Sequence, residues 1–245
     1  MADTSSNEPT SGGPWSQRGF VAAAAFLGIV IVAAVGILLI GPGDSSDSDR
    51  GTPPQGGNNG KPAASADPAA SVCGLEAGSQ EIPQTPPEAK WELVGKVAAP
   101  SGPAGPGRKE GKLRSCYAHS PTGALFAAAN FIAVASVANT DDEVIRALTA
   151  DTAARDALPD DVAGDGSGSR AQVAGFRIVG ASANDVTVEL AFNVTTPDGR
   201  QGVVGMSLPF RWERGDWKFV VGSTSDPYNT QALDSTSGFV PWSGA

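Results

Sequence analysis

The feature that most constrains this chain is an apolar run near its N-terminus, from Gly19 to Ile40. The run holds no charged residue, and as a helix with a rise of about 1.5 Å per residue it spans roughly 33 Å. That length crosses a hydrocarbon layer of about 30 Å, so the pattern predicts a transmembrane helix over 19–41. The alternative is a cleaved signal peptide, which has a basic leader, a shorter apolar core and an Ala-x-Ala cleavage site. The flank here offers only Arg18 and no such site, which favours a retained anchor.

Charged residues beside the run indicate its orientation. Arg18 stands at the N-terminal end, whereas three aspartates follow the other end between Asp44 and Asp49. Basic residues stay on the cytoplasmic side, so we expect a single-pass cell-membrane protein with a cytoplasmic N-terminus and an extracytoplasmic C-terminal domain. Small residues every four positions in the span would let two helices pack closely and self-associate. The plainer interpretation is the ordinary composition of an Ala-rich span.

Composition divides the rest of the 245 residues. Polar, Pro/Gly/Ser-rich stretches cannot bury enough apolar surface to offset the entropy of ordering. The expected parts are a disordered cytoplasmic tail over 1–18, a flexible linker over 42–88, a folded extracytoplasmic domain over 89–225 and a C-terminal tail over 226–245. The formal charge of −9 argues against a nucleic-acid surface and against electrostatic docking on anionic lipid.

Two cysteines, Cys73 and Cys116, suit a disulfide if the domain faces an oxidising compartment. Closing a loop of about 44 residues stabilises by roughly 4 kcal/mol in the chain-entropy model. The alternative is a pair of buried or free thiols. Two Cys and one His at unrelated spacings cannot fill a four-ligand zinc shell, so we expect no metal site and no cofactor.

The folded part begins with helices. Ser120 is a favourable N-cap and Pro121 suits the first helical position. The following run 124–138 is apolar on nearly every face, as in a short helix buried on all sides. Thr140 with Glu143 forms a capping-box pattern, which predicts that a second helix begins there.

Beyond Arg170 the apolar period changes from the helical one to two. Alternation over 173–179, 185–195, 204–212 and 217–221, with turn signals between the runs, predicts four antiparallel strands with one wet face. Pro209 removes a ladder donor from the third long strand, so we expect a bulge or a free edge there. The expected fold class is α+β, with helices packed on a curved four-stranded antiparallel sheet.

This order of parts resembles a group of bacterial, actinobacterial-type single-pass membrane proteins with an extracytoplasmic cystatin-like, nuclear-transport-factor-two-like domain. The resemblance spans residues 15–225. It is carried by the layout, by the segment Cys116 to Ala124 that opens the helices, and by the closing strand from Asp216 to Val221. It implies a cystatin-like roll. It also implies a role like that of the bitopic assembly component of type IV secretion and conjugation machines, or of the membrane proteins associated with lipid importers.

Candidate catalytic residues all have plainer explanations. His119 adjoins an N-cap and suits a structural role in the turn, and capping accounts for Ser120. Glu189 would be a general acid or base only if its face of the strand lined a pocket, and the polar neighbours on that face indicate a solvated surface. The acidic loop over 160–165 lacks the spacing of a calcium loop. We therefore expect no catalytic site and no enzyme.

Three aromatic residues, Trp91, Phe239 and Trp242, are the candidates for contact with a partner. Burial against the domain, with the tail acting as a terminal clamp, is the alternative. The leading functional hypothesis is a membrane-anchored scaffold module that binds other envelope proteins, as in conjugative transfer. A second hypothesis is a module that holds a lipid or small apolar ligand between helix and sheet.

Overall fold

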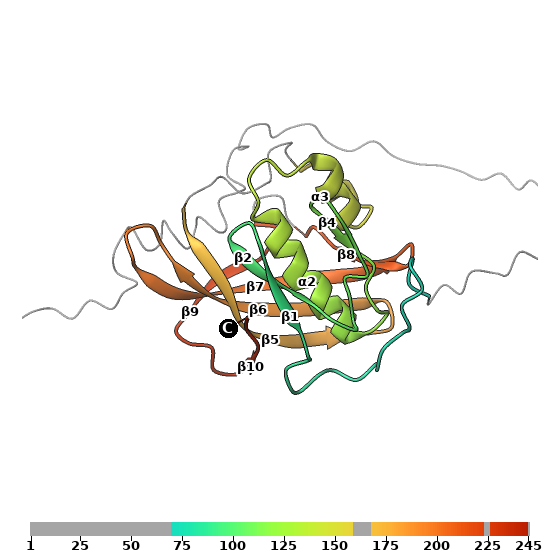
Figure 1. Ribbon diagram of the computed structural model, residues 1–245, viewed down its shortest axis with the longest axis horizontal. Coiled ribbons are helices and arrows are strands. Elements are labelled where there is room, and N and C mark those ends of the chain that lie inside the picture. The colour runs from blue at the N-terminus through green and yellow to red at the C-terminus, as the bar shows by residue number, and fades with distance from the viewer. Residues whose placement is uncertain (1–69, 159–167, 223–225, 245) are drawn as a thin grey trace, which may run out of the picture.

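A six-stranded antiparallel sheet dominates the computed structural model, which describes residues 70–158, 168–222 and 226–244 (Figure 1). The sheet has the order β10-β5-β6-β7-β8, and β9 pairs with a separate stretch of β7. The three long strands bury alternate side chains, as the sequence predicts, because successive residues of a strand point to opposite faces. The strands are β5 (Arg170–Ala181), β6 (Asp185–Thr195), β7 (Gln201–Glu213), β8 (Asp216–Phe219), β9 (Thr230–Leu233) and β10 (Val240–Pro241).

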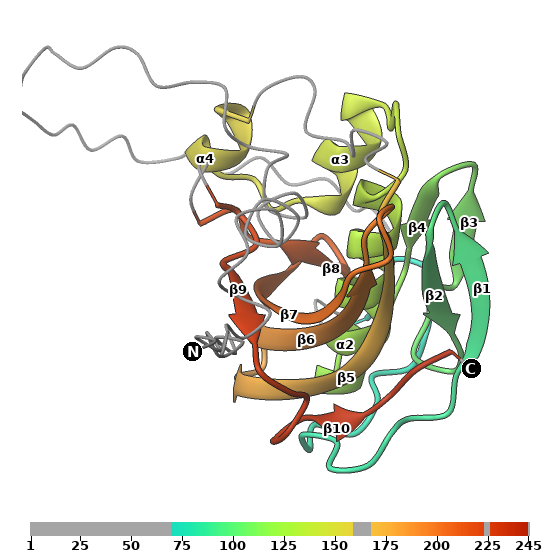
Figure 2. The ribbon, with the colours of Figure 1, turned by 90° about the vertical axis from the view of Figure 1, so that its left-hand side faces the viewer.

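Helix α2 (Pro121–Ala135) lies between this sheet and a second layer of short strands (Figure 2). All of its residues except Thr122 are buried, which explains why the sequence is apolar on nearly every face of the helix. The polar exception, Asn130, donates its amide to the carbonyls of Pro100 and Phe126, each at 2.9 Å. The N-cap prediction is confirmed, since Ser120 Oγ accepts the backbone N–H of Gly123 at 3.1 Å. The second layer consists of the hairpins β1 (Lys90–Val94)–β2 (Val97–Ser101) and β3 (Arg108–Glu110)–β4 (Leu113–Ser115).

Two short helices, α3 (Asp142–Leu148) and α4 (Ala153–Asp156), follow α2. The predicted capping box is wrong: the N-cap of α3 is Asp141, which makes no side-chain capping bond. Thr140 instead donates its hydroxyl to the carbonyls of Val134 (3.2 Å) and Val137 (2.9 Å). Val134 lies in the last turn of α2 and Val137 just beyond it, so Thr140 closes the end of α2 and does not cap α3.

Pro209 lies at a break in the edge pairing of β7. Strand β9 pairs with residues 203–206 and β8 with residues 210–213, so Pro209 falls between the two partners. The Pro209 carbonyl still accepts the N–H of Val220 at 2.8 Å, so this edge position is not free and the free-edge expectation is not confirmed. The bulge is wrong, because β6 and β7 keep one register along their whole length. The register shifts occur in β5, between Val173 and Gly175 and between Ile178 and Gly180.

The C-terminal segment 226–244 passes from one edge of the sheet to the other and closes the core. It pairs with β7 through β9 and with β5 through β10 (Figure 2). Trp242 then inserts against Phe126 and Phe176, with ring centroids 5.4 and 5.6 Å away, and is only 4 % exposed. The alternative expectation of a terminal clamp is therefore confirmed for this tryptophan.

The predicted fold class, an α+β cystatin-like roll on a four-stranded sheet, is wrong. The described chain is mostly β-structure: six strands form the main sheet, four more form two hairpins, and the helices are few and short. The prediction failed because β9, β10 and the hairpin strands span only two to five residues, too few for a period of two to be recognised.

The expected anchor over 19–41 and most of the expected linker lie outside the described residues. In the described ranges, no helix has the length and hydrophobicity that a membrane crossing requires.

Candidate functional site

An open groove lies where the first described residues meet the start of α2. Its volume is about 530 Å³, and its walls come from three segments: residues 74–79, the loop at Pro103 and Ala104, and residues 118–122. The lining is mainly small side chains and main chain, and its polar side chains are Glu76, Ser79, Ser120 and Thr122. A surface of this composition can take an extended chain more readily than a bulky cofactor.

The predicted disulfide lies beside this groove, because Cys73 directly precedes the lining residue Gly74 and Cys116 lies two residues before Ala118. Cys73 and Cys116 are bonded, with their Cα atoms 5.9 Å apart, and Cys116 is fully buried. A Cβ on Gly107 would lie 2.8 Å from the sulfur of Cys73, so this position must stay glycine for the loop to pass the bridge. The bond therefore fixes residues 71–75 against the folded chain, next to the groove.

A buried carboxylate supports the other side of the bridge. Asp216 is 2 % exposed and accepts the backbone N–H groups of Cys116, Tyr117 and Trp217, each at 3.0 Å. Lys218 Nζ also reaches it at 3.3 Å and pairs with its charge. This arrangement satisfies a buried charge with donors from segments 100 residues apart in sequence, and so holds the turn before α2 on β8.

Aromatic side chains complete the support around the turn. The ring of His119 stacks on Trp212 with centroids 4.1 Å apart, and its Nε2 donates to the carbonyl of Ala183 at 2.6 Å. Trp217 Nε1 donates to the carbonyl of Ala118 at 2.9 Å. His119 is 8 % exposed, so the structural role expected for it agrees with its position.

Burial also raises the pKa of the Tyr117 phenol well above its ordinary value, and the nearby charge of Asp216 raises it further. The hydroxyl donates to the carbonyl of Arg114 at 3.3 Å. The phenol therefore stays protonated near neutral pH and serves as a hydrogen-bond donor within the fold.

Glu189 lies on the face of β6 opposite the core residues Val188 and Leu190. It forms an ion pair with Arg177 of β5 across the sheet. The guanidinium of Arg177 in turn lies over the ring of Phe239 at 4.7 Å. These contacts hold the C-terminal tail on the outer face of the sheet, and they place Glu189 away from both the groove and the core.

The other candidate residues do not gather at the groove. Trp91 and Trp242 contact each other with ring centroids 4.9 Å apart on the far side of α2, and Phe239 remains half-buried on the outer face. Trp242 cannot offer its ring to a partner because the core encloses it. The acidic loop over 160–165 lies outside the described residues, and among those described no three His, Cys, Asp or Glu side chains are grouped for a metal.

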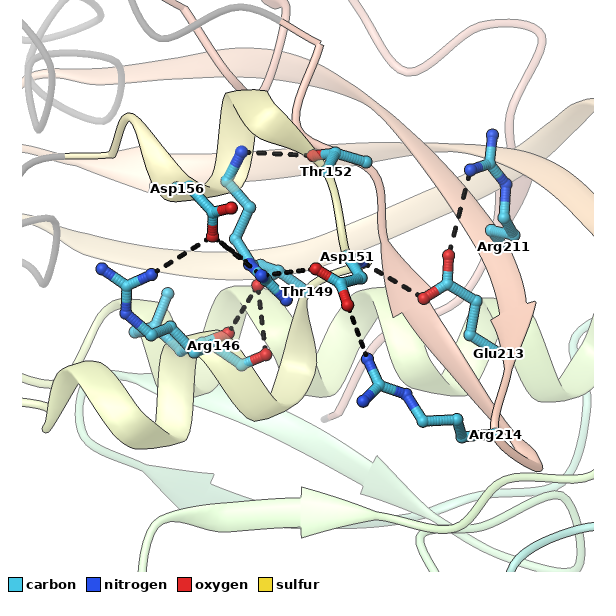
Figure 3. A network of polar contacts seen from close by, with 10 residues as sticks. Arg146, Thr149, Asp151, Thr152, Asp156, Arg211, Glu213 and Arg214 are labelled. Carbon is cyan, nitrogen blue, oxygen red and sulfur yellow. Dashed lines mark hydrogen bonds and ion pairs between the residues drawn. The ribbon is translucent and has the colours of Figure 1, made fainter. Parts of the chain in front are cut away.

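A second polar cluster joins α3 and α4 to the β7–β8 turn (Figure 3). Arg155 contacts Asp151 at 2.6 Å and Asp156 at 2.7 Å, and Arg146 reaches Asp156 at 3.5 Å. The backbone N–H of Asp151 donates to Glu213 at 3.2 Å. Most of these side chains are exposed, so each pair contributes little energy, and their effect is to fix α4 against the hairpin.

One pocket within the described core lies beside its packed rings and is small. The pocket bounded by Phe131, Phe219 and Tyr228 has a volume of about 10 Å³, the space of roughly one water molecule. This is far below the volume of a typical ligand site of roughly 300 Å³ or more.

Comparison with protein families gave one match. The model of a family described as a domain of unknown function (DUF8175) matches residues 52–241. The chain belongs to this family. The matched range contains both bonded cysteines, the groove and the tail as far as β10. Searches among curated proteins and among solved structures found no match.

Sequence reasoning missed both the groove and its support by Asp216. The groove is formed by residues 74–79, which composition assigned to the linker, and their only signal was the cysteine at position 73. Asp216 directly follows Gly215 in the turn between the runs 204–212 and 217–221, where aspartate is a common turn residue. The neighbouring sequence does not distinguish an exposed turn aspartate from one whose carboxylate oxygens accept N–H groups of a distant segment.

Proposed function

We propose that this protein is a non-enzymatic, single-pass membrane protein whose extracytoplasmic domain binds other proteins of a cell-envelope assembly, such as a conjugative transfer machine. The observation that carries the proposal is the disulfide-braced groove. It combines an open volume of about 530 Å³ with walls that are fixed by a covalent bond and by buried hydrogen bonds. Rigid walls reduce the entropy lost on binding.

The partner segment we propose for the groove is an extended peptide. The main-chain N–H groups of Ala77 and Gly78 donate to no other residue in the described part of the chain. Free main-chain groups along a groove suit recognition by main-chain hydrogen bonds, with small side chains allowing a close approach. The filled core beside Phe131 gives no support to the alternative of a lipid held between helix and sheet.

Two features together support the proposed compartment. A stable disulfide favours an oxidising environment, and the apolar run at 19–41 favours attachment to a membrane. Both fit a domain held outside the cytoplasmic membrane by a tether.

Site-specific cross-linking in intact cells tests the proposal. A photo-reactive residue at Ala77 or Thr122, on the two walls of the groove, is expected to give discrete adducts with other membrane or envelope proteins. The same residue at Asn193, exposed on the large sheet, is the matched control. Recovery of only monomer after detergent extraction, or equal adducts at Asn193, would contradict the proposal.

A further inference from the structure

The layer made by β1–β4 differs in charge from the rest of the chain. Residues 90–115 contain six Lys or Arg against two Glu, a net charge of +4 in a chain of −9. The net charge of the whole chain therefore conceals a basic layer. Its cations are Lys90, Lys96, Arg108, Lys109, Lys112 and Arg114.

Most of this positive charge is not neutralised locally. Lys109 and Arg114 both pair with a single carboxylate, Glu92. Among the described residues, Lys90 and Lys96 have no ion-pair partner and both are exposed. The other two cations of the layer reach only main-chain carbonyls in the described ranges. The layer therefore presents unbalanced positive charge to solvent.

Helix α2 lies between most of the basic layer and the large sheet, and the two meet directly only where β2 contacts β5 among the described elements (Figure 2). A helix with its side chains is about 10 Å across, which is close to the Debye length of about 8–10 Å near physiological salt. Exposed acidic residues on the far face of the sheet lie across both the helix and the sheet, more than one such length away, and the salt around the protein largely screens exposed charges at that separation. The exclusion drawn from net charge alone does not apply to this surface.

We infer that the β1–β4 layer docks on an anionic membrane surface. Besides its charge, the layer carries Leu93, which is 70 % exposed, and an exposed aliphatic side chain favours the interfacial region of a bilayer. The tether also joins the domain beside this layer, because Arg108 contacts the carbonyl of Val72 at 3.4 Å. The inference rests on the proposed membrane attachment.

The tether would keep the layer close to lipid. The proposed anchor over 19–41 ends about 30 residues before the first described residue, and a chain reaches at most about 3.3–3.6 Å per residue, so the domain stays within a fixed distance of the membrane. Docking is then an intramolecular step at high effective concentration, and it needs only the modest attraction that each cation contributes near an anionic leaflet. An acidic protein surface is the competing occupant, but nothing links the tether or the exposed Leu93 to such a partner.

The test uses the full chain reconstituted into nanodiscs of phosphatidylcholine alone or with added phosphatidylglycerol. The measurement is the acylation rate of Lys109 and Lys112, read by mass spectrometry. We expect slower acylation in the anionic discs and recovery when salt is raised. The triple variant Lys90→Gln, Lys96→Gln and Arg108→Gln should lower the docking constant about a hundredfold, since each cation near the surface contributes about fivefold.

Glutamine at Arg170, Arg200 and Arg211, which lie on or beside the large sheet, removes the same charge and should leave docking unchanged. Thermal melts of both triple variants check that the fold is kept. Equal acylation in the two kinds of disc overturns docking while leaving membrane attachment intact. Protection that appears only after envelope proteins are added also overturns it, in favour of an acidic protein partner. Failure of the chain to insert into any disc would instead contradict the proposed attachment.

Discussion

Replacing Asp216 by asparagine is expected to destabilise the domain strongly although the two side chains have the same shape. One carboxylate oxygen accepts the N–H groups of Tyr117 and Trp217, and the other accepts Cys116 N–H and contacts Lys218 Nζ. In asparagine, one of these oxygens becomes an amide NH₂. In either orientation of the amide, its NH₂ group faces two of these four donors, and those two lose their acceptor.

The size of the effect follows from those two lost bonds. A hydrogen bond to a charged group contributes about 1.5–3 kcal/mol, and Asp216 is buried, so water cannot replace the missing acceptor. We therefore expect the free energy of unfolding to fall by about 3–6 kcal/mol. That is a large part of the roughly 5–15 kcal/mol that holds a typical domain together.

Urea denaturation with the disulfide intact measures this change, followed by the fluorescence of the buried tryptophans. The matched control is Asp185→Asn, which removes an exposed carboxylate whose side chain pairs with Arg211 at 3.1 Å and is 61 % exposed. The control should change stability by less than about 1 kcal/mol. If Asp216→Asn behaves like the control, the carboxylate does not hold the turn before α2, and the account of the groove wall fails.

Three further outcomes are expected. The double variant Cys73→Ser and Cys116→Ser should lose about 4 kcal/mol of unfolding free energy, the loop-closure value for a sequence separation of 43, and urea midpoints of the oxidised and double-serine forms measure it. Trp242→Ala should cost about 3–5 kcal/mol in thermal or urea unfolding, whereas alanine at the half-buried Phe239 should cost clearly less, so equal losses would contradict the clamp. Burial raises the pKa of Tyr228 to about 12, so the folded state keeps its proton where the unfolded state releases it. The contribution of this group to the free energy of unfolding should be fully present below about pH 10 and fall by about 3 kcal/mol as the pH rises to about 12. Tyr228→Phe should remove this pH dependence of the unfolding free energy.

The long elements could be predicted from sequence because each carries its own local signal. The buried face of β6 follows from strict alternation through Val186, Val188 and Leu190, and helix α2 follows from Ser120 and Pro121. These signals depend only on residues that are neighbours in the chain. They are therefore readable without knowing what packs against them.

The elements that were missed depend on distant partners. Strand β9 has the polar sequence TQAL, and it is a strand only because the edge of β7 between Val203 and Met206 is free to pair with it. Thr140 has the pattern of a helix start, yet it bonds the end of the preceding helix. In both cases the local pattern is weak and a tertiary hydrogen bond decides the structure.

The basic layer of β1–β4 likewise could not be recognised from the charge of the whole chain. The net charge is a sum over the whole chain, whereas a partner contacts only one surface of the protein. Helix α2 lies between most of the layer of charge +4 and the large sheet of the acidic remainder. Because α2 is covered by the large sheet on one side and by β1–β4 on the other, it needs no polar face. Trp242 packs on Phe126 of α2 and covers the helix where these two layers leave it open. A helix buried between two unlike layers is thus the feature from which both the filled core and the separate basic surface arise.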